Sequence, residues 1–88
     1  MRISPDFILR DVAGVSVVIP TREAARRFSG LISLNETGTF LFTLLQEERT
    51  EQELVEKMLE TYDIDATVAA EDVAEFIANL QEHQMLAE

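Results

Sequence analysis

The chain has 88 residues, of which 47% are hydrophobic and 27% charged, values typical of one soluble globular domain. A domain of this size buries only about 60–65% of its unfolded surface, so a deep, enclosed active site is not expected. The chain has no cysteine, which excludes disulfides and thiolate metal sites and fits a reducing cytoplasm. We find no signal-peptide pattern and no apolar run approaching the length of a membrane helix, so export and membrane insertion are not expected.

The net charge of −10 is unevenly spread along the chain. Residues 1–30 carry five arginines and three acidic residues, whereas residues 31–88 carry two basic and fourteen acidic residues. An acidic surface repels phosphate, so nucleic acid is a poor partner for the larger, C-terminal part. A basic or apolar peptide is easier for such a surface to accept.

Two short runs of β-branched and aromatic residues, 7–12 and 15–19, predict two strands near the N-terminus. Ala13-Gly14 separates them, and a two-residue connection with glycine favours a tight hairpin because glycine readily adopts a positive φ. Pro20 ends the second run, since proline has no N–H for a strand ladder.

The next segment, residues 21–30, is rich in arginine and indicates a connector. One helical turn is predicted at residues 23–28, with the Phe28 side chain tucked inward. Residues 31–34 are mostly apolar and predict a short third strand. Asn35, a favourable N-cap residue, follows directly and marks the change from strands to helices.

Three helices are predicted in the rest of the chain. Glu36 lies in the first turn of the first helix, where the positive end of the helix dipole favours a carboxylate. Thr50-Glu51-Gln52-Glu53 has the spacing of a capping box and starts the second helix. The third helix is predicted to begin near Asp65 or Thr67. Apolar residues at helical spacing predict the buried faces: Phe40, Leu41, Leu44, Leu45, Leu54, Val55, Met58, Leu59, Tyr62, Val73, Phe76, Ile77 and Leu80.

The order of these elements predicts the fold class. Three short strands followed by three helices indicate a single α+β domain over residues 1–88, of the winged-helix type, with a three-stranded antiparallel sheet on one side of the helices. Gly38 costs about 1 kcal/mol relative to alanine inside a helix, so we expect it to allow a close approach, for example to the sheet. Met85-Leu86 is expected to fold back onto the core.

Residues suited to catalysis or metal binding are scarce. His83 is the only histidine, and its neighbours Gln81, Glu82 and Gln84 are poor partners for a metal site that needs three or four ligands. The glycines form no phosphate-binding loop, and the serines have no obvious base beside them. The sequence therefore predicts a non-enzymatic protein without cofactor or metal.

Several segments resemble the PqqD family in order and spacing. The most specific is Leu34-Asn35-Glu36-Thr37-Gly38, at the predicted junction of third strand and first helix. The resemblance covers roughly residues 5–87. Gln84 departs from it, standing where many relatives have glycine before the last hydrophobic pair. The other similar segments are residues 28–33, 40–45, 49–54, 72–80 and 85–86.

This resemblance implies a function. PqqD proteins, also called RiPP precursor peptide recognition elements, are small winged-helix domains that bind the leader region of a ribosomally synthesised precursor peptide. They present it to a modifying enzyme, often a radical SAM maturase, and that enzyme carries the cofactors. The resemblance favours peptide recognition over any one pathway, pyrroloquinoline quinone biosynthesis included.

The resemblance also implies where the leader binds. The leader is expected to add as a strand beside the third strand, in a groove against the third helix, because an unpaired strand edge offers free N–H and C=O groups. The small residues Ala70, Ala74 and Ala78 fit a close approach there, although helix propensity explains alanines equally well. The expected peptide-binding residues are Leu31, Ile32, Ser33, Leu34, Val73, Ala74, Ile77, Ala78 and Gln81.

The charge of the third helix leaves two interpretations open. Glu71, Asp72 and Glu75 either favour leaders with Lys or Arg or form an ordinary solvated face.

Two alternative functions are a winged-helix DNA-binding regulator and a module that pairs its exposed strand with a second copy to form a homodimer. The precursor peptide, the maturase and the final product are not specified by the sequence.

Overall fold

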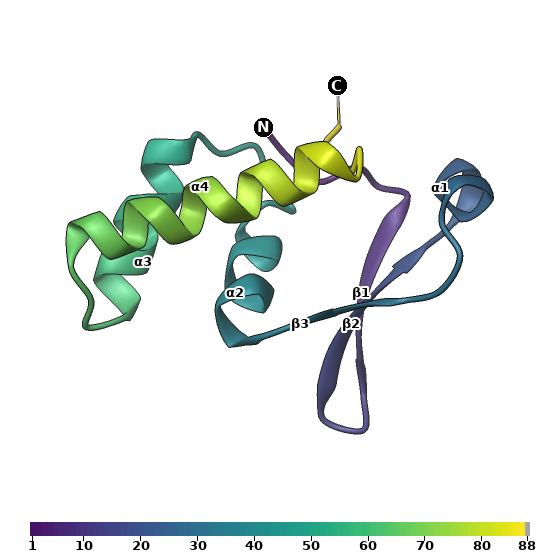
Figure 1. Cartoon of the computed structure of the whole chain (residues 1–88), viewed down its shortest axis with the longest axis horizontal. Helices are drawn as coiled ribbons and strands as arrows, with labels where there is room; N and C mark the ends of the chain where they lie inside the picture. Colours follow the sequence, from purple (N-terminus) through teal and green to yellow (C-terminus); the bar gives the residue numbers. More distant parts are fainter. Residues whose placement is uncertain (88) are drawn as a thin grey trace.

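The N-terminal part of the protein folds into a three-stranded antiparallel sheet in the order β1–β2–β3, as predicted. The structure is a computed structural model that describes residues 1–87 (Figure 1). The strands are β1 (Phe7–Val12), β2 (Val15–Pro20) and β3 (Ile32–Leu34). The turn residues Ala13 and Gly14 both have positive φ, 54° and 83°, which is the backbone of the tight hairpin turn expected from the sequence.

A short helix, α1 (Arg22–Arg27), connects β2 to β3 where one helical turn was predicted. Its buried Ala24 belongs to the core, and Phe28 packs edge-on against Phe7 with 5.4 Å between ring centroids. The backbone N–H of Thr21 donates to the Asp6 carbonyl at 2.7 Å. These contacts fix the basic helix at one end of the molecule (Figure 1).

The predicted helices are α2 (Glu36–Leu44), α3 (Glu51–Thr61) and α4 (Ala66–Glu82). Asn35 is the N-cap of α2, and its side chain accepts a hydrogen bond from the Gly38 N–H at 2.8 Å. Both hydrogen bonds of the capping box between Thr50 and Glu53 are present at the start of α3. None of the helices within residues 1–87 is both long and apolar enough to cross a membrane.

The core lies where the sheet, α2, α3 and α4 meet. The predicted buried face of α2 was partly wrong, because Phe42 is fully buried while Phe40 and Leu44 are only partly buried. Residues 40–45 are apolar at every position but Thr43, so periodicity alone does not select one face. Leu59 in α3 was also expected inside, but 39% of its surface is exposed. The large, fully buried side chains are Phe42, Leu41, Leu45, Leu54, Met58, Val18 and Val73.

The two ends of the described chain lie side by side (Figure 1). Ile3 and Leu86 form an antiparallel bridge, and the Met85 side chain is buried, so the expected return of Met85-Leu86 to the core is confirmed. Gln84 adopts a left-handed backbone with φ 55°, and the Met85 N–H donates to the Leu80 carbonyl at 2.8 Å. This pattern closes the helix end in the way that glycine usually does.

Candidate functional site

One side of β3 has no strand partner within residues 1–87. β3 pairs with β2 through Leu34 opposite Ser16, Ser33 opposite Val17 and Ile32 opposite Val18, and it is the last strand in the sheet order. The side chains alternate: Ile32 and Leu34 are half-buried against the core, whereas Ser33 is exposed. The backbone groups on the outer side of β3 are therefore open to pairing with another chain.

A hollow of about 320 Å³ adjoins this edge. Ser33 and Leu34 line it from the end of β3, and Leu41 contributes from α2. On the other side, α4 contributes Phe76, Asn79 and two acidic residues, Asp72 and Glu75. A volume near 300 Å³ is at the small end of ligand pockets, so the hollow has the size for a side chain rather than for a cofactor.

The start of α2 packs closely against the end of β3 beside this hollow. A Cβ added to Gly38 would lie 3.1 Å from the Asn35 Oδ1 and 3.5 Å from the Leu34 Cδ2. The contact with Asn35 is tighter than most Cβ contacts, so the Asn35 side chain would have to shift, whereas the distance to Leu34 is an ordinary van der Waals contact. The glycine therefore lets the cap residue and the end of β3 approach the helix, which is the close approach predicted from its helix-breaking cost.

The flank of α4 that lines the hollow was not predicted as the wall of the groove, although the sequence had indicated Asp72 and Glu75 as residues that could favour leaders with Lys or Arg. Asp72, Glu75, Phe76 and Asn79 recur at helical spacing on one side of the buried stripe of α4. Helical spacing groups these residues on one flank in the same way that it groups Ala70, Ala74 and Ala78 on the other. The sequence therefore did not favour one flank over the other. Asn35 and Gly38 also line the hollow, and both belong to the segment that carries the resemblance.

The structure separates the α4 residues expected to contact a peptide into two groups. Val73 and Ile77 are buried in the core. Ala74, Ala78 and Gln81 are exposed and do not belong to the lining of the hollow, because at 100° per residue they fall on the opposite flank of α4. Leu31 is 61% exposed immediately before β3, and Gln81 lines a second surface depression beside Arg27 and Gln84.

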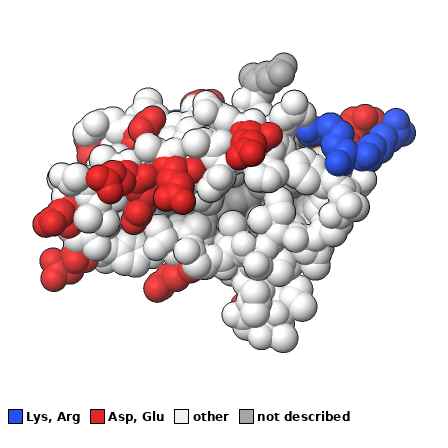
Figure 2. All heavy atoms as spheres, viewed as in Figure 1, with Lys and Arg blue, Asp and Glu red and all other residues white. Residues whose placement is uncertain are grey.

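The site has an acidic side and a distant basic counterpart. Within residues 1–87, neither Asp72 nor Glu75 is within 4 Å of a basic group. Figure 2 shows the acidic side chains spread over the α3–α4 part and the basic side chains gathered at the opposite end, over α1. No group of three or more residues able to hold a metal ion is found within the described chain.

The comparison with known families decides the identity. The family model for PqqD, coenzyme PQQ synthesis protein D, matches residues 16–86. The chain belongs to the PqqD family. The resemblance seen in the sequence is thereby confirmed. No curated protein matches the chain.

Two solved structures share the fold of this PqqD-family protein. TbiB1 in complex with the TbiA(beta) leader peptide has a TM-score of 0.77 and 20% identity, covering 98% of this chain and 94% of that one. Lasso peptide synthetase B1 complexed with the leader peptide has a TM-score of 0.76 and 18% identity, covering 99% of this chain and 96% of that one. At this level of identity the two structures establish the common fold, which confirms the predicted α+β class.

Proposed function

We propose that this protein binds the leader region of a ribosomally synthesised precursor peptide and presents it to a modifying enzyme. The observation that carries the proposal is the open outer edge of β3 beside the hollow against α4. Main-chain pairing along Ile32–Leu34 holds an extended peptide, and the hollow selects one of its side chains. The two similar structures were both solved with leader peptides, which supports this kind of ligand.

In this proposal the wall of the groove is formed by Asp72, Phe76 and Asn79 of α4, because these residues line the hollow. Phe76 is half-buried and packs against the core, so it offers an apolar floor whose position is fixed. Leu34 and Leu41 extend that floor beneath the end of β3. The aliphatic part of one leader side chain fits the apolar centre of the hollow, and polar residues form its rim.

The protein acts as a non-enzymatic accessory in this proposal. The modifying enzyme, such as a radical SAM maturase, carries the cofactors and the chemistry. A DNA-binding function is disfavoured, because α4 (Ala66–Glu82) contains no Lys or Arg to contact phosphate.

Nuclear magnetic resonance of isotope-labelled protein tests the binding site. The probe is a synthetic leader peptide from a short reading frame encoded beside a modifying enzyme. We expect the amide signals of residues 31–34 and 72–79 to shift and the amides of β3 to become protected from exchange. Saturable binding that shifts only β1, the other edge of the sheet, would refute the proposed site.

Self-association is the second candidate, because the edge that accepts a peptide also accepts a second copy of β3. Leu31, exposed at the start of that edge, favours such pairing. Sedimentation over a concentration series measures it, with and without the leader peptide. If the two partners share β3, the peptide converts the dimer to the monomer; a dimer that persists at saturating peptide would show that another surface mediates it.

A further inference from the structure

The end of the site nearest α2 is acidic. Asp72 and Glu75 line the hollow beside the C-terminal end of β3, and within the described chain no basic group neutralises them at salt-bridge distance. An extended peptide on the outer edge of β3 passes this hollow at one end only. A cationic side chain placed there keeps its aliphatic stem on Phe76 and its charge beside the two carboxylates.

The other end of β3 is basic. The backbone carbonyl oxygen of Asn79 lies 2.8 Å from the Nδ1 of His83. The His83 ring lies 6.1 Å from the Phe28 ring. The Arg27 guanidinium lies 5.7 Å from the centre of that Phe28 ring and donates to the Gln84 Oε1 at 2.6 Å. These contacts hold the Arg27 charge near the segment that leads into β3.

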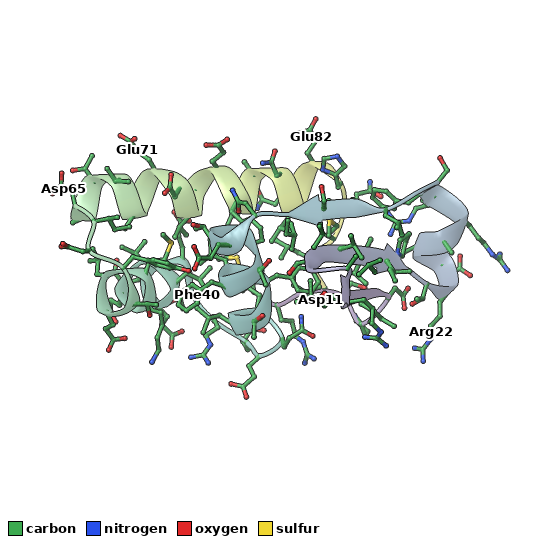
Figure 3. All side chains as sticks on the ribbon, turned by 90° about the horizontal axis from the view of Figure 1, so that it is seen from below. Asp11, Arg22, Phe40, Asp65, Glu71 and Glu82 are labelled. Carbon is green, nitrogen blue, oxygen red and sulfur yellow. The ribbon has the colours of Figure 1, made fainter. Side chains whose placement is uncertain are left out.

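The acidic residues at this end of α4 do not cancel that charge. Glu82 lies beside His83 in the chain, but its side chain points away from the body of the domain, as does that of Glu71 (Figure 3). Within residues 1–87, Arg27 forms no salt bridge, whereas its neighbour Arg26 pairs with Glu23 at 3.6 Å. Arg27 is therefore the cation available to a peptide at the start of β3.

The spacing of the two ends fits an extended peptide. From Glu75 to His83 the rise along α4 is about 12 Å at 1.5 Å per residue. An extended chain advances about 3.3 Å per residue, so the same span corresponds to about four peptide residues. Figure 1 shows α4 and β3 running in opposite directions, which places the acidic pair at the C-terminal end of β3 and Arg27 at its start.

We propose that this charge polarity fixes the direction of the bound leader: a Lys or Arg lies at Asp72 and Glu75, and an Asp or Glu about four residues further along lies at Arg27. This inference rests on the proposed function. Antiparallel pairing is the more stable kind, so the added strand runs opposite to β3 and its basic residue precedes the acidic one. The preferred ligand class is therefore a leader with the order basic, apolar, acidic.

The expected size of the effect follows from exposed ion pairs. Each such pair changes an affinity by about two- to fivefold. Exchanging the basic and acidic residues of the peptide replaces two attractions with two repulsions, so we expect about tenfold weaker binding at low salt. The difference shrinks as salt is added, because exposed charges are screened.

A random 12-residue peptide library selected against the wild-type protein supplies the probe. We expect enrichment of peptides with Lys or Arg about four positions before Asp or Glu. One selected peptide and its charge-exchanged isomer are then compared by fluorescence anisotropy at low salt. The Asp72→Asn/Glu75→Gln variant should lose most of the tenfold discrimination, and Arg27→Gln should lose part of it.

The matched control is Glu71→Gln/Glu82→Gln, which removes the same number of carboxylates from the outward face of α4 and should keep the discrimination. Equal binding of the two isomers, or an equal loss in the control, would overturn the inference. If selected peptides shift the β3 amides regardless of charge order, only this inference fails. If the selection enriches no common peptide sequence, or if no selected peptide shifts the amide signals of β3, the proposed function itself fails.

Discussion

A single bulky residue on the correct flank of α4 should block the site. Asn79 lines the hollow and is exposed, so an indole at this position occupies space that the peptide side chain needs. Full burial of a leucine-sized aliphatic group contributes about 1.5–3 kcal/mol, which is the upper limit in a hollow lined by polar as well as apolar residues. Its exclusion therefore raises Kd by at most about 10- to 150-fold, since each 1.4 kcal/mol is a factor of ten.

Ala78→Trp provides the matched control for Asn79→Trp. Ala78 is the adjacent residue on the same helix and is also exposed, but it lies outside the lining of the hollow. Isothermal titration of both variants with one leader peptide should show the loss for Asn79→Trp and a change within about twofold for Ala78→Trp, which is below 0.5 kcal/mol. Circular dichroism and thermal unfolding verify that both variants are folded. A large loss with Ala78→Trp alone would instead place the peptide on the alanine row and refute the assignment of the groove wall.

Three further predictions concern the helix ends that stabilise the fold. Asn35→Ala removes the cap of α2 and should cost about 1 kcal/mol, or roughly 4–8 °C in Tm, while Asn35→Ser should retain most of the stability; equal losses in both would show that capping is not the cause. Gln84→Gly relieves the left-handed backbone and should raise the unfolding free energy by about 0.5 kcal/mol, whereas Gln84→Val should lower it, both measured by urea unfolding; a less stable glycine variant would contradict this. Hydrogen bonds with the backbone and the side chain of Thr50 hold the pKa of Glu53 below its ordinary value. The Glu53 carboxylate therefore contributes to folding stability at neutral pH, and this contribution is lost as the pH falls through the lowered pKa. The stability difference between wild type and Glu53→Gln should therefore shrink from pH 7 to pH 3, and a constant difference would disprove the linkage.

Local signals in the sequence predicted most of the fold. The Ala13-Gly14 turn, the Asn35 cap and the Thr50 capping box each depend on residues within four positions of one another. Their physical causes, positive φ and unpaired N–H groups at helix starts, operate before any tertiary contact forms. These features are accordingly the ones that the structure confirms residue by residue.

Packing between elements was less predictable. The segment around Phe42 is apolar on all sides, and only the simultaneous presence of the sheet and the other helices decides that this residue is buried and Phe40 is not. The same limit applies to Leu59, which has the spacing of a buried residue but stands at the margin of the α3 stripe. Periodicity gives the direction of the core, whereas the width of the buried face depends on what covers it.

The wall of the groove was difficult to predict for the same reason. A buried stripe on a helix has two flanks, and the sequence of α4 offers small residues on one and polar residues with Phe76 on the other. Small residues suggested close approach, but helix propensity accounts for them without any ligand. What selects the flank is the path of β3 across α2, fixed by Gly38 and the Asn35 cap, which brings Ser33 and Leu34 to the side of Asp72 and Asn79. Gly38 lies in α2, whereas the flank belongs to α4. The sequence of α4 alone therefore could not show which of its flanks faces the open edge of β3.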